Sequence, residues 1–461
     1  MDTLRKYRKS IIFINRFIFI AVIIALFVFV FLNYYEPAVF FFKGNIILVL
    51  VYIALYFVLA LTYGCFRIGI FSVSELFLSH CLSIIITNVI AYFIICLVAR
   101  EMLDIMMFFI MTLAQVFLGA VFYIFATRIY FRLFLVRNCV AIGNSTELNL
   151  DLFYKYNQIK TRFNIDVVLD ERDGFDSLKQ QIDQHSTVIL GDINRELRSR
   201  LITYCFEKNI RIYVEPTMSD IMMHNAHETH INDSLVYLCR NRGPSTEQRI
   251  IKRLIDIVAS VLGLIAFSPI MLLVAIPIKL YDSGPVFFKQ KRLTLNGKEF
   301  WLIKFRSMVQ NAEDDGIARL ASKGDKRITP VGRIIRAARL DELPQIINIL
   351  KGDMSLVGPR PERPEIMEEY CEVFPEFRYR LKMKAGLTGY AQIYGKYNTT
   401  FEDKVKMDLL YIVRYSVLFD IRLIFATIKT VFMKDSTEGI EPDSILPTAM
   451  QKGNDSEKEN F

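Results

Sequence analysis

Residues 339–345 read Arg-Leu-Asp-Glu-Leu-Pro-Gln. The proline of this stretch suits the first position of a helix, where a missing N–H costs nothing, and the following residues keep helical spacing until Gly352. Asp341 and Glu342 are therefore predicted to stand beside a helix N-terminus, whose free N–H groups and dipole favour anions. That helix end would keep both carboxylates ionised and help to hold a phosphate group nearby.

The two carboxylates are adjacent in the chain, and adjacent side chains point in different directions. One can attack a phosphorus atom while the other holds a divalent metal that neutralises the charge of the substrate. Taken alone, an Asp-Glu pair is more often an acidic loop before a helix. The sequence on either side favours the phosphate site.

Basic and glycine-containing strings surround the pair. They are residues 283–288 (Ser-Gly-Pro-Val-Phe-Phe), 290–292 (Gln-Lys-Arg), 304–308 (Lys-Phe-Arg-Ser-Met), 358–361 (Gly-Pro-Arg-Pro) and 386–392 (Gly-Leu-Thr-Gly-Tyr-Ala-Gln), with Arg333, Arg336, Arg339, Arg380, Lys382 and Lys384. Guanidinium groups bind phosphate oxygens in two-pronged fashion, and a proline on each side restricts the backbone from which Arg360 projects. Each arginine by itself is more often a solvated surface charge.

Together these strings resemble the bacterial sugar transferases, also called polyprenyl-phosphate hexose-1-phosphate transferases, from Lys252 to about Lys434. The strings at 304–308, 341–345 and 358–361 occur in the order and spacing of that family. The resemblance implies transfer of a sugar 1-phosphate from a UDP-sugar to undecaprenyl phosphate with Mg²⁺, giving undecaprenyl-diphosphate-sugar and UMP. This step initiates capsule, exopolysaccharide or O-antigen synthesis.

The resemblance also implies roles for individual residues. Asp341 would be the nucleophile that carries an aspartyl phosphosugar intermediate, and Glu342 its catalytic and metal-site partner. The phosphate and nucleotide site would contain Lys304, Arg306, Arg336 and Arg360. Two departures from the family pattern, Thr294 and Ala385, put loop geometry and substrate choice in question but leave the reaction untouched.

The 461 residues, 53% of them hydrophobic, are typical of a membrane protein with two or three domains. Four apolar spans at 11–32, 45–63, 80–99 and 105–126 each approach the ~20 residues that cross a hydrocarbon core. Helices buried in a large soluble core are the less favoured alternative. The predicted fold is a membrane α-helical bundle (1–137), an α/β Rossmann-like domain (138–242), an α-rich monotopic catalytic domain (243–436) and a disordered tail (437–461).

Basic residues before the first span and after the fourth place both ends of the bundle in the cytoplasm. They are Arg5, Lys6, Arg8, Lys9, Arg128, Arg132 and Arg137. We therefore expect a multi-pass protein of the bacterial cytoplasmic (inner) membrane with a cytoplasmic catalytic domain. The net charge of +8 favours contact with the lipid bilayer or a phosphorylated substrate, and no nucleic-acid partner is expected because aromatic-basic reading motifs are lacking. Homo-oligomerisation and polysaccharide assembly proteins are left open.

Residues 138–242 alternate short apolar strands, at 139–143, 166–170, 187–191 and 210–214, with amphipathic segments, as in a parallel sheet. The turn after the first strand lacks the glycines of G-x-G-x-x-G, which favours a structural or regulatory module over an NAD site. An NAD-dependent sugar-modifying enzyme stays the alternative for this domain. His224, His227 and His230 recur every third residue, which suggests either a metal site or the polar face of a helix.

A fifth apolar segment, 257–280, contains Pro269 and Pro277 and carries basic residues at both ends, which argues against crossing. A proline inside a helix kinks it, and Ser268 is expected to help satisfy the freed backbone groups. We predict a re-entrant helix over 250–281 that enters and leaves on the cytoplasmic face, with a fifth crossing as the alternative.

Residues 409–433 alternate apolar positions with Arg414, Asp420, Arg422 and Lys429, which is the spacing of amphipathic helices suited to the headgroup layer. The sugar is not readable from the sequence, and glucose, galactose and N-acetylated hexosamines remain open. A membrane scaffold that binds nucleotide sugars through a lapsed site is the rival interpretation of the whole chain.

Overall fold

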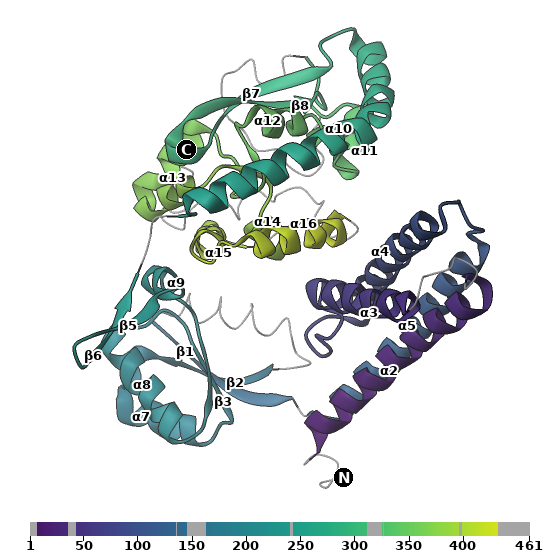
Figure 1. The fold of residues 1–461 in the computed structure, drawn as a ribbon. Coiled ribbons are helices and arrows are strands. Elements are labelled where there is room, and N and C mark those ends of the chain that lie inside the picture. The colour runs from purple at the N-terminus through teal and green to yellow at the C-terminus, as the bar shows by residue number, and fades with distance from the viewer. Residues whose placement is uncertain are drawn as a thin grey trace. The chain divides into compact units, whose positions relative to one another are not determined.

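The computed structural model describes residues 7–35, 43–134, 136–144, 163–239, 243–310, 325, 327–395 and 399–431. The chain forms two compact units, Met1–Thr217 and Met218–Phe461 (Figure 1). The expected disordered tail at 437–461 lies outside the described residues, as do Arg5 and Lys6.

The first unit contains four long apolar helices, which confirms the four predicted spans as helices. They are α2 (Arg8–Val30, continued by η1, Phe31–Tyr35), α3 (Gly44–Tyr63), α4 (Val73–Ala99) and α5 (Met106–Leu133). Each is long and apolar enough to cross a membrane. Helix α4 begins seven residues earlier than predicted because Ser72 and Glu75 form a capping box, in which each side chain accepts a hydrogen bond from the other's backbone N–H.

The interior of these helices contains polar side chains that satisfy one another. Asn88 on α4 accepts a hydrogen bond from the Tyr52 hydroxyl (2.9 Å) and donates one to Gln115 Oε1 (2.8 Å). Gln115 Nε2 in turn donates to the Ile23 carbonyl of α2 (3.1 Å). Buried amides paired in this way connect all four helices, and such interhelical hydrogen bonds stabilise membrane bundles.

The first unit also contains a four-stranded parallel sheet in the order β2-β1-β3-β4, which confirms the four predicted strands. Its elements are β1 (Arg137–Gly143), β2 (Phe163–Asp170), η2 (Glu171–Asp173), α7 (Phe175–Asp183), β3 (Thr187–Leu190), α8 (Arg195–Glu207) and β4 (Arg211–Val214). Leu178 of α7 and Leu201 of α8 pack with Val140 and Val188 on one face of the sheet. This domain is therefore of mixed α/β type.

The second unit begins with α9 (Met218–Met223) and an exposed hairpin of β5 (His227–Ile231) and β6 (Ser234–Leu238). His227 and His230 both lie on β5, so the interpretation of the histidine repeat as a polar helix face is wrong. Within the described ranges, no three His, Cys, Asp or Glu side chains cluster as metal ligands.

Helix α10 (Thr246–Asp282) is the fifth apolar segment, and Figure 1 shows it as two runs that meet at a bend. Pro269 has no N–H to donate to the carbonyl four residues earlier, Ile265, and the Ser268 hydroxyl donates to that carbonyl instead (3.1 Å). This confirms the expected role of Ser268. Leu262, Leu272 and Leu273 are 61%, 66% and 68% exposed, so this unit does not cover the apolar middle of the helix.

The remaining elements of the second unit surround two small sheets. They are β7 (Phe287–Leu293), η3 (Leu295–Gly297), β8 (Glu299–Phe305), α11 (Pro330–Ala337), η4 (Leu340–Glu342), α12 (Gln345–Lys351), β9 (Ser355–Val357), α13 (Pro364–Val373), η5 (Pro375–Lys382), β10 (Gly386–Thr388), α14 (Tyr390–Tyr394), α15 (Phe401–Val413) and α16 (Val417–Val431). Strands β7 and β8 are antiparallel, whereas β9 and β10 are parallel. Phe300 and Leu302 of β8 pack on Ile349 of α12, which joins the hairpin to the carboxylate segment.

The first turns of α10 are bonded to this unit. Arg253 donates to the carbonyls of Ile349 and Leu350 (both 2.7 Å) and so caps the C-terminus of α12. Asp256 accepts the N–H of Leu356 on β9 (2.9 Å). These contacts fix α10 to the two elements that flank the predicted site.

A buried ion pair also holds α10. Lys252 Nζ lies 2.5 Å from Asp420 on α16 and 2.9 Å from the Val357 carbonyl, and the Tyr411 hydroxyl donates to the same carboxylate (2.7 Å). Asp420 and Lys429 were expected on the polar outer face of an amphipathic helix, but both are buried. Asp420 and Lys429 therefore lie in the interior of this unit.

We predict that Lys252→Met destabilises the second unit by about 3–5 kcal/mol, because it leaves the Asp420 carboxylate buried without its cation. The sole tryptophan, Trp301, lies in this unit, so its fluorescence reports the thermal unfolding midpoint directly. Lys252→Met with Asp420→Leu should recover most of the loss. Equal destabilisation by the single and double variants would contradict the prediction.

Candidate active site

The two predicted carboxylates lie in η4, a short turn between α11 and α12. Arg339, just before it, has a left-handed backbone (φ 54°), which is uncommon for a residue with a side chain and turns the chain sharply. Leu340 and Leu343 pack against the apolar cluster that contains Ile335 of α11. Asp341 and Glu342 are thus held between two partly buried leucines, and they lie close to the N-terminus of α12, as predicted.

Arg360 reaches this turn from the loop after β9. Its Nη2 atom donates to Glu342 Oε1 at 3.1 Å. The loop backbone is fixed because Gly358 donates to the Thr388 carbonyl (2.8 Å) and Gly386 donates to the Pro359 carbonyl (2.9 Å). A Cβ on Gly358 would lie 2.2 Å from the carbonyl oxygen of Lys384, so this approach requires glycine. The structure therefore brings together the strings at 358–361 and 386–392.

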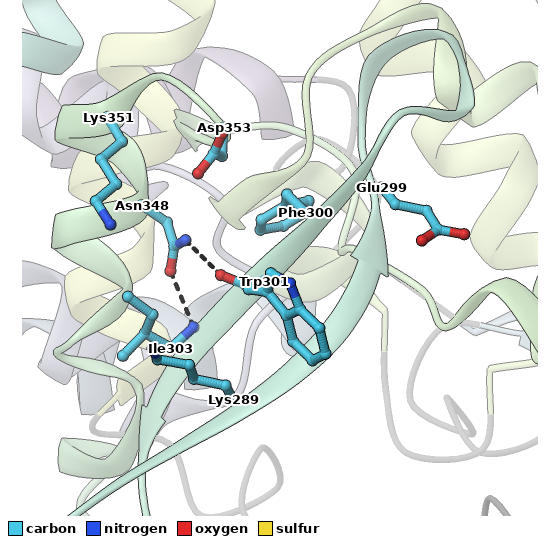
Figure 2. A pocket seen from close by; sticks show the side chains of 8 residues that line it. All are labelled: Lys289, Glu299, Phe300, Trp301, Ile303, Asn348, Lys351 and Asp353. Atoms are coloured by element: carbon cyan, nitrogen blue, oxygen red, sulfur yellow. Dashed lines mark hydrogen bonds between the residues drawn. The ribbon is translucent and has the colours of Figure 1, made fainter.

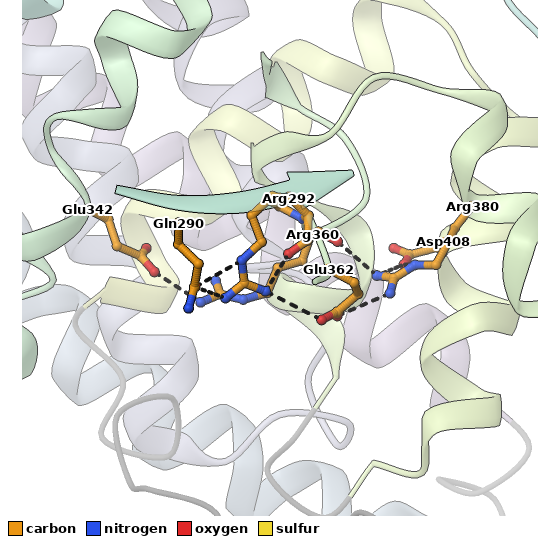
Figure 3. Close-up of polar contacts among 8 residues, drawn as sticks. Gln290, Arg292, Glu342, Arg360, Glu362, Arg380 and Asp408 are labelled. Atoms are coloured by element: carbon orange, nitrogen blue, oxygen red, sulfur yellow. Dashed lines mark hydrogen bonds and ion pairs between the residues drawn. The ribbon is translucent and has the colours of Figure 1, made fainter. Parts of the chain in front are cut away.

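A chain of buried charges supports the same loop (Figure 3). Arg380 donates to the Arg360 carbonyl (3.2 Å), to Glu362 Oε1 (3.1 Å) and to Asp408 Oδ2 (2.8 Å). Arg292 on β7 donates to the backbone of this loop and lies 3.8 Å from Glu362. Both arginines are among the basic residues that surround the carboxylate pair in the sequence. The sequence does not indicate that Glu362 and Asp408 are their partners.

Lys304 and Arg336 act on the carboxylates electrostatically. Burial lowers the pKa of Lys304 to about 8, with the charge of Arg360 adding to this and Glu342 and Asp341 opposing it. Arg336, in the last turn of α11, is one of the cations that oppose the rise in the pKa of Asp341. These residues form one charged cluster with the η4 turn.

The structure places Arg306 elsewhere. Its guanidinium pairs with Asp282 at the end of α10 and lies 3.4 Å from the Ile278 carbonyl, filling the space left by the missing side chain of Gly284. Among its described hydrogen bonds and ion pairs, none reaches Asp341 or Glu342. Arg306 anchors the second end of α10, a role that its string at 304–308 does not reveal.

The two carboxylates have separated pKa values. Burial, followed by the charge of Glu342, raises the pKa of Asp341 to about 6. Burial also opposes ionisation of Glu342, but the charges of Arg360, Lys304 and Arg339 outweigh it and lower the pKa of Glu342 below its usual value. Adjacent carboxylates whose environments separate their pKa values suit different chemical roles.

A cavity of about 440 Å³ lies beside β8 and the C-terminal half of α12 (Figure 2). Its lining consists of Lys289, Glu299, Phe300, Trp301, Ile303, Asn348, Lys351 and Asp353. None of these is a predicted site residue. The charged cluster lies outside this lining, and it is the cluster that brings arginine side chains to the adjacent carboxylates Asp341 and Glu342.

The fold contains several helices that are long and apolar enough to cross a membrane, and it places two adjacent carboxylates beside arginine side chains. A family model described as bacterial sugar transferase matches residues 247–434. An uncharacterized sugar transferase, EpsL, of Bacillus subtilis is 38% identical over 193 residues, which cover 42% of this chain and 91% of that protein. The chain belongs to the bacterial sugar transferase family.

Two further relatives carry functional names. The UDP-N-acetylgalactosamine-undecaprenyl-phosphate N-acetylgalactosaminephosphotransferase of Aeromonas hydrophila is 37% identical over 235 residues, or 50% of this chain and 55% of that protein. The UDP-glucose:undecaprenyl-phosphate glucose-1-phosphate transferase of Escherichia coli is 42% identical over 185 residues, or 39% of this chain and 40% of that protein. The chain spans about half the length of these two curated relatives.

We predict that Asp341 titrates near pH 6 and that Glu342→Gln moves its pKa down, because removing the Glu342 charge eases ionisation of its neighbour. Infrared difference spectra of purified protein report the protonated carboxyl band as pH falls through this range. Asp341→Asn, which should lack the band, is the assignment control. An Asp341 pKa that rises or stays fixed in Glu342→Gln would contradict this coupling.

Proposed function

We propose that this protein transfers a sugar 1-phosphate from a UDP-sugar to undecaprenyl phosphate, forming undecaprenyl-diphosphate-sugar and UMP. The observation that carries the proposal is the Arg360–Glu342 ion pair beside Asp341. The pKa of Asp341, about 6, leaves this carboxylate largely ionised at neutral pH. Family membership and the names of the relatives support it. Because those names specify different sugars, they do not choose one for this chain.

The reaction follows from a single nucleophile used twice. A carboxylate oxygen of Asp341 attacks the phosphorus that bears the sugar, and the bond from that phosphorus to the oxygen of UMP breaks. The resulting acyl phosphate holds the phosphosugar on the enzyme. A phosphate oxygen of the lipid then attacks the same phosphorus and restores the Asp341 carboxylate. The C1–O bond of the sugar stays intact throughout, and both transfers conserve charge.

The basic residues offset the negative charge that moves during these steps. The positive charges of Lys304, Arg336 and Arg360 act on the carboxylates of the η4 turn. Fixed cations in a partly buried site stabilise phosphoryl transition states because they need not reorganise during the reaction. Arg360, already bonded to Glu342, is suited to holding the departing UMP phosphate. Arg306 contributes indirectly by holding α10.

Mg²⁺ is the expected cofactor. It is bound in proteins by one or two carboxylates, with substrate phosphates and water completing its oxygen shell. Asp341 and Glu342 supply such a pair, so the donor set fits. When bound, the metal would polarise the phosphate oxygens of the substrate. The role of Glu342 is to stay ionised beside it, which its lowered pKa permits.

Helix α10 would be re-entrant, and the contacts of its two ends support this. Lys252 near its start pairs with Asp420, and Asp282 at its end pairs with Arg306, so both ends are bonded to the same compact unit. A straight 37-residue helix would span about 55 Å and separate them. The bent, apolar middle would lie in the bilayer on the cytoplasmic side, and the α/β domain would be a Rossmann-like module.

We predict that, without a lipid acceptor, the enzyme releases UMP from a UDP-sugar up to about one equivalent and retains the phosphosugar on Asp341. Asp341→Asn should abolish the trapped species and lower turnover by about 10³-fold or more, since it keeps the shape but removes the nucleophile. Quenched incubations analysed for UMP and by mass spectrometry of the peptide test this. Asp353→Asn, a carboxylate on the cavity of Figure 2, is the matched control. Strict dependence of UMP release on the acceptor would indicate direct transfer instead.

We predict that cysteines placed at Gly243 and at Asn454 are both shielded from an impermeant thiol reagent in intact cells, because α10 returns to the side that it enters. Glu101→Cys, in the turn between α4 and α5, should be labelled and serves as the control. The background is a variant with the seven native cysteines replaced. Labelling at 454 but not at 243 would establish a fifth crossing.

A further inference from the structure

One buried amide connects the carboxylate segment to the strand that carries Lys304. Asn348, on α12, is 1% exposed. Its Nδ2 atom donates to the Trp301 carbonyl (2.8 Å), and its Oδ1 atom accepts the Ile303 N–H (3.0 Å), as Figure 2 shows. Both groups belong to the backbone of β8, so the Asn348 side chain binds the main chain of the strand.

These backbone groups lie on the edge of β8 that β7 leaves unpaired. Arg306 donates to the Val286 carbonyl (2.9 Å), and in an antiparallel pair every second residue, here Lys304 and Leu302, continues that bonding. Trp301 and Ile303 therefore turn their N–H and C=O groups away from β7. The hairpin is a two-stranded sheet, and Asn348 satisfies part of its free edge.

The two hydrogen bonds of Asn348 fix the position of β8 along α12, which apolar packing alone does not fix. Phe300 and Leu302 also pack on Ile349 of α12, but apolar contacts are non-directional and tolerate sliding. One donor and one acceptor, aimed at two specified backbone atoms, admit a single position of β8 along α12. Lys304 immediately follows the bonded residue Ile303.

Strand β8, which carries Lys304, also contacts the η4 turn. The charges of Glu342 and Asp341 oppose the lowering of the Lys304 pKa, so the lysine and the two carboxylates lie within electrostatic reach of one another. The turn joins α12 through two intervening residues, so the position of α12 sets the position of the carboxylates. We propose that Asn348 is a positioning residue, which holds β8, and with it Lys304, in a fixed register with α12 and with the η4 turn that carries Asp341 and Glu342. The catalytic consequence rests on the proposed function.

The test uses the full-length protein with Asn348→Leu, which keeps the volume but removes both hydrogen bonds, and Asn348→Ser as a milder variant. Lys351→Gln, on the same helix and cavity, is the matched control. We expect kcat in Asn348→Leu to fall about tenfold or more, because small misplacements of reacting groups are costly, with KM for the UDP-sugar changed less than about twofold. Lys351→Gln should leave both kcat and KM unchanged.

A second readout is independent of the reaction. Trp301 is the only tryptophan, and its own carbonyl is the acceptor for Asn348, so its fluorescence anisotropy should fall in Asn348→Leu while circular dichroism stays constant. If the wild type releases no UMP from any UDP-sugar, the proposed function fails while this measurement still tests the register. Unchanged Trp301 anisotropy, or a kcat that falls only in proportion to the folded fraction, would overturn the proposal. If Asn348→Leu does not fold, the same two criteria apply to Asn348→Ser.

Discussion

The ion pair between Arg360 and Glu342 joins the loop after β9 to the turn before α12, and much of the second unit maintains it. Gly358 and Gly386 let two backbone segments touch, and Arg380 holds the Arg360 carbonyl from the opposite side. The guanidinium charge offsets the burial of Glu342 and keeps that carboxylate ionised. Without it, two neighbouring buried carboxylates would compete for one proton, and their roles would no longer be distinct.

Helix α10 and the charged cluster are connected by direct contacts. Lys252, Arg253 and Asp256 bond the start of α10 to Asp420, to the end of α12 and to β9, while Asp282 bonds its other end to Arg306. Charged side chains are thus confined to the two ends, and the exposed leucines occupy the middle. The same helix that would contact lipid also sets the spacing of the elements that carry the site.

Local signals in the sequence predict the elements well, because caps, prolines and periodicity act over a few residues. The turn at Asp341, the helix that Gly352 ends and the four parallel strands are all of this kind. Partner choice is different, because it depends on where distant segments meet. Arg306 and Arg380 look alike as surface charges in the sequence, yet one bonds α10 and the other supports the Arg360 loop.

The same limit explains the errors. A histidine at every third position is compatible with a helix, but residues 227–231, which include two of the three histidines, pair with β6 in a hairpin. Asp420 and Lys429 have the spacing of an outward polar stripe, and only the position of α10 shows that Asp420 is needed inside. In each case a contact between segments far apart in the sequence decides the environment of the side chain.

The bonds at the start of α10 also bear on the order in which the chain is made. Ribosomes synthesise α10 before the segments that contain Ile349, Leu356 and Asp420, so the helix must wait for its partners. An apolar helix that is exposed to water before its partners are made is prone to aggregate, whereas insertion into the bilayer would bury its apolar surface. Folding of this unit would then begin at the membrane, and the later segments would fold onto the inserted helix. A version of the unit without α10 would lack the surface that directs its assembly.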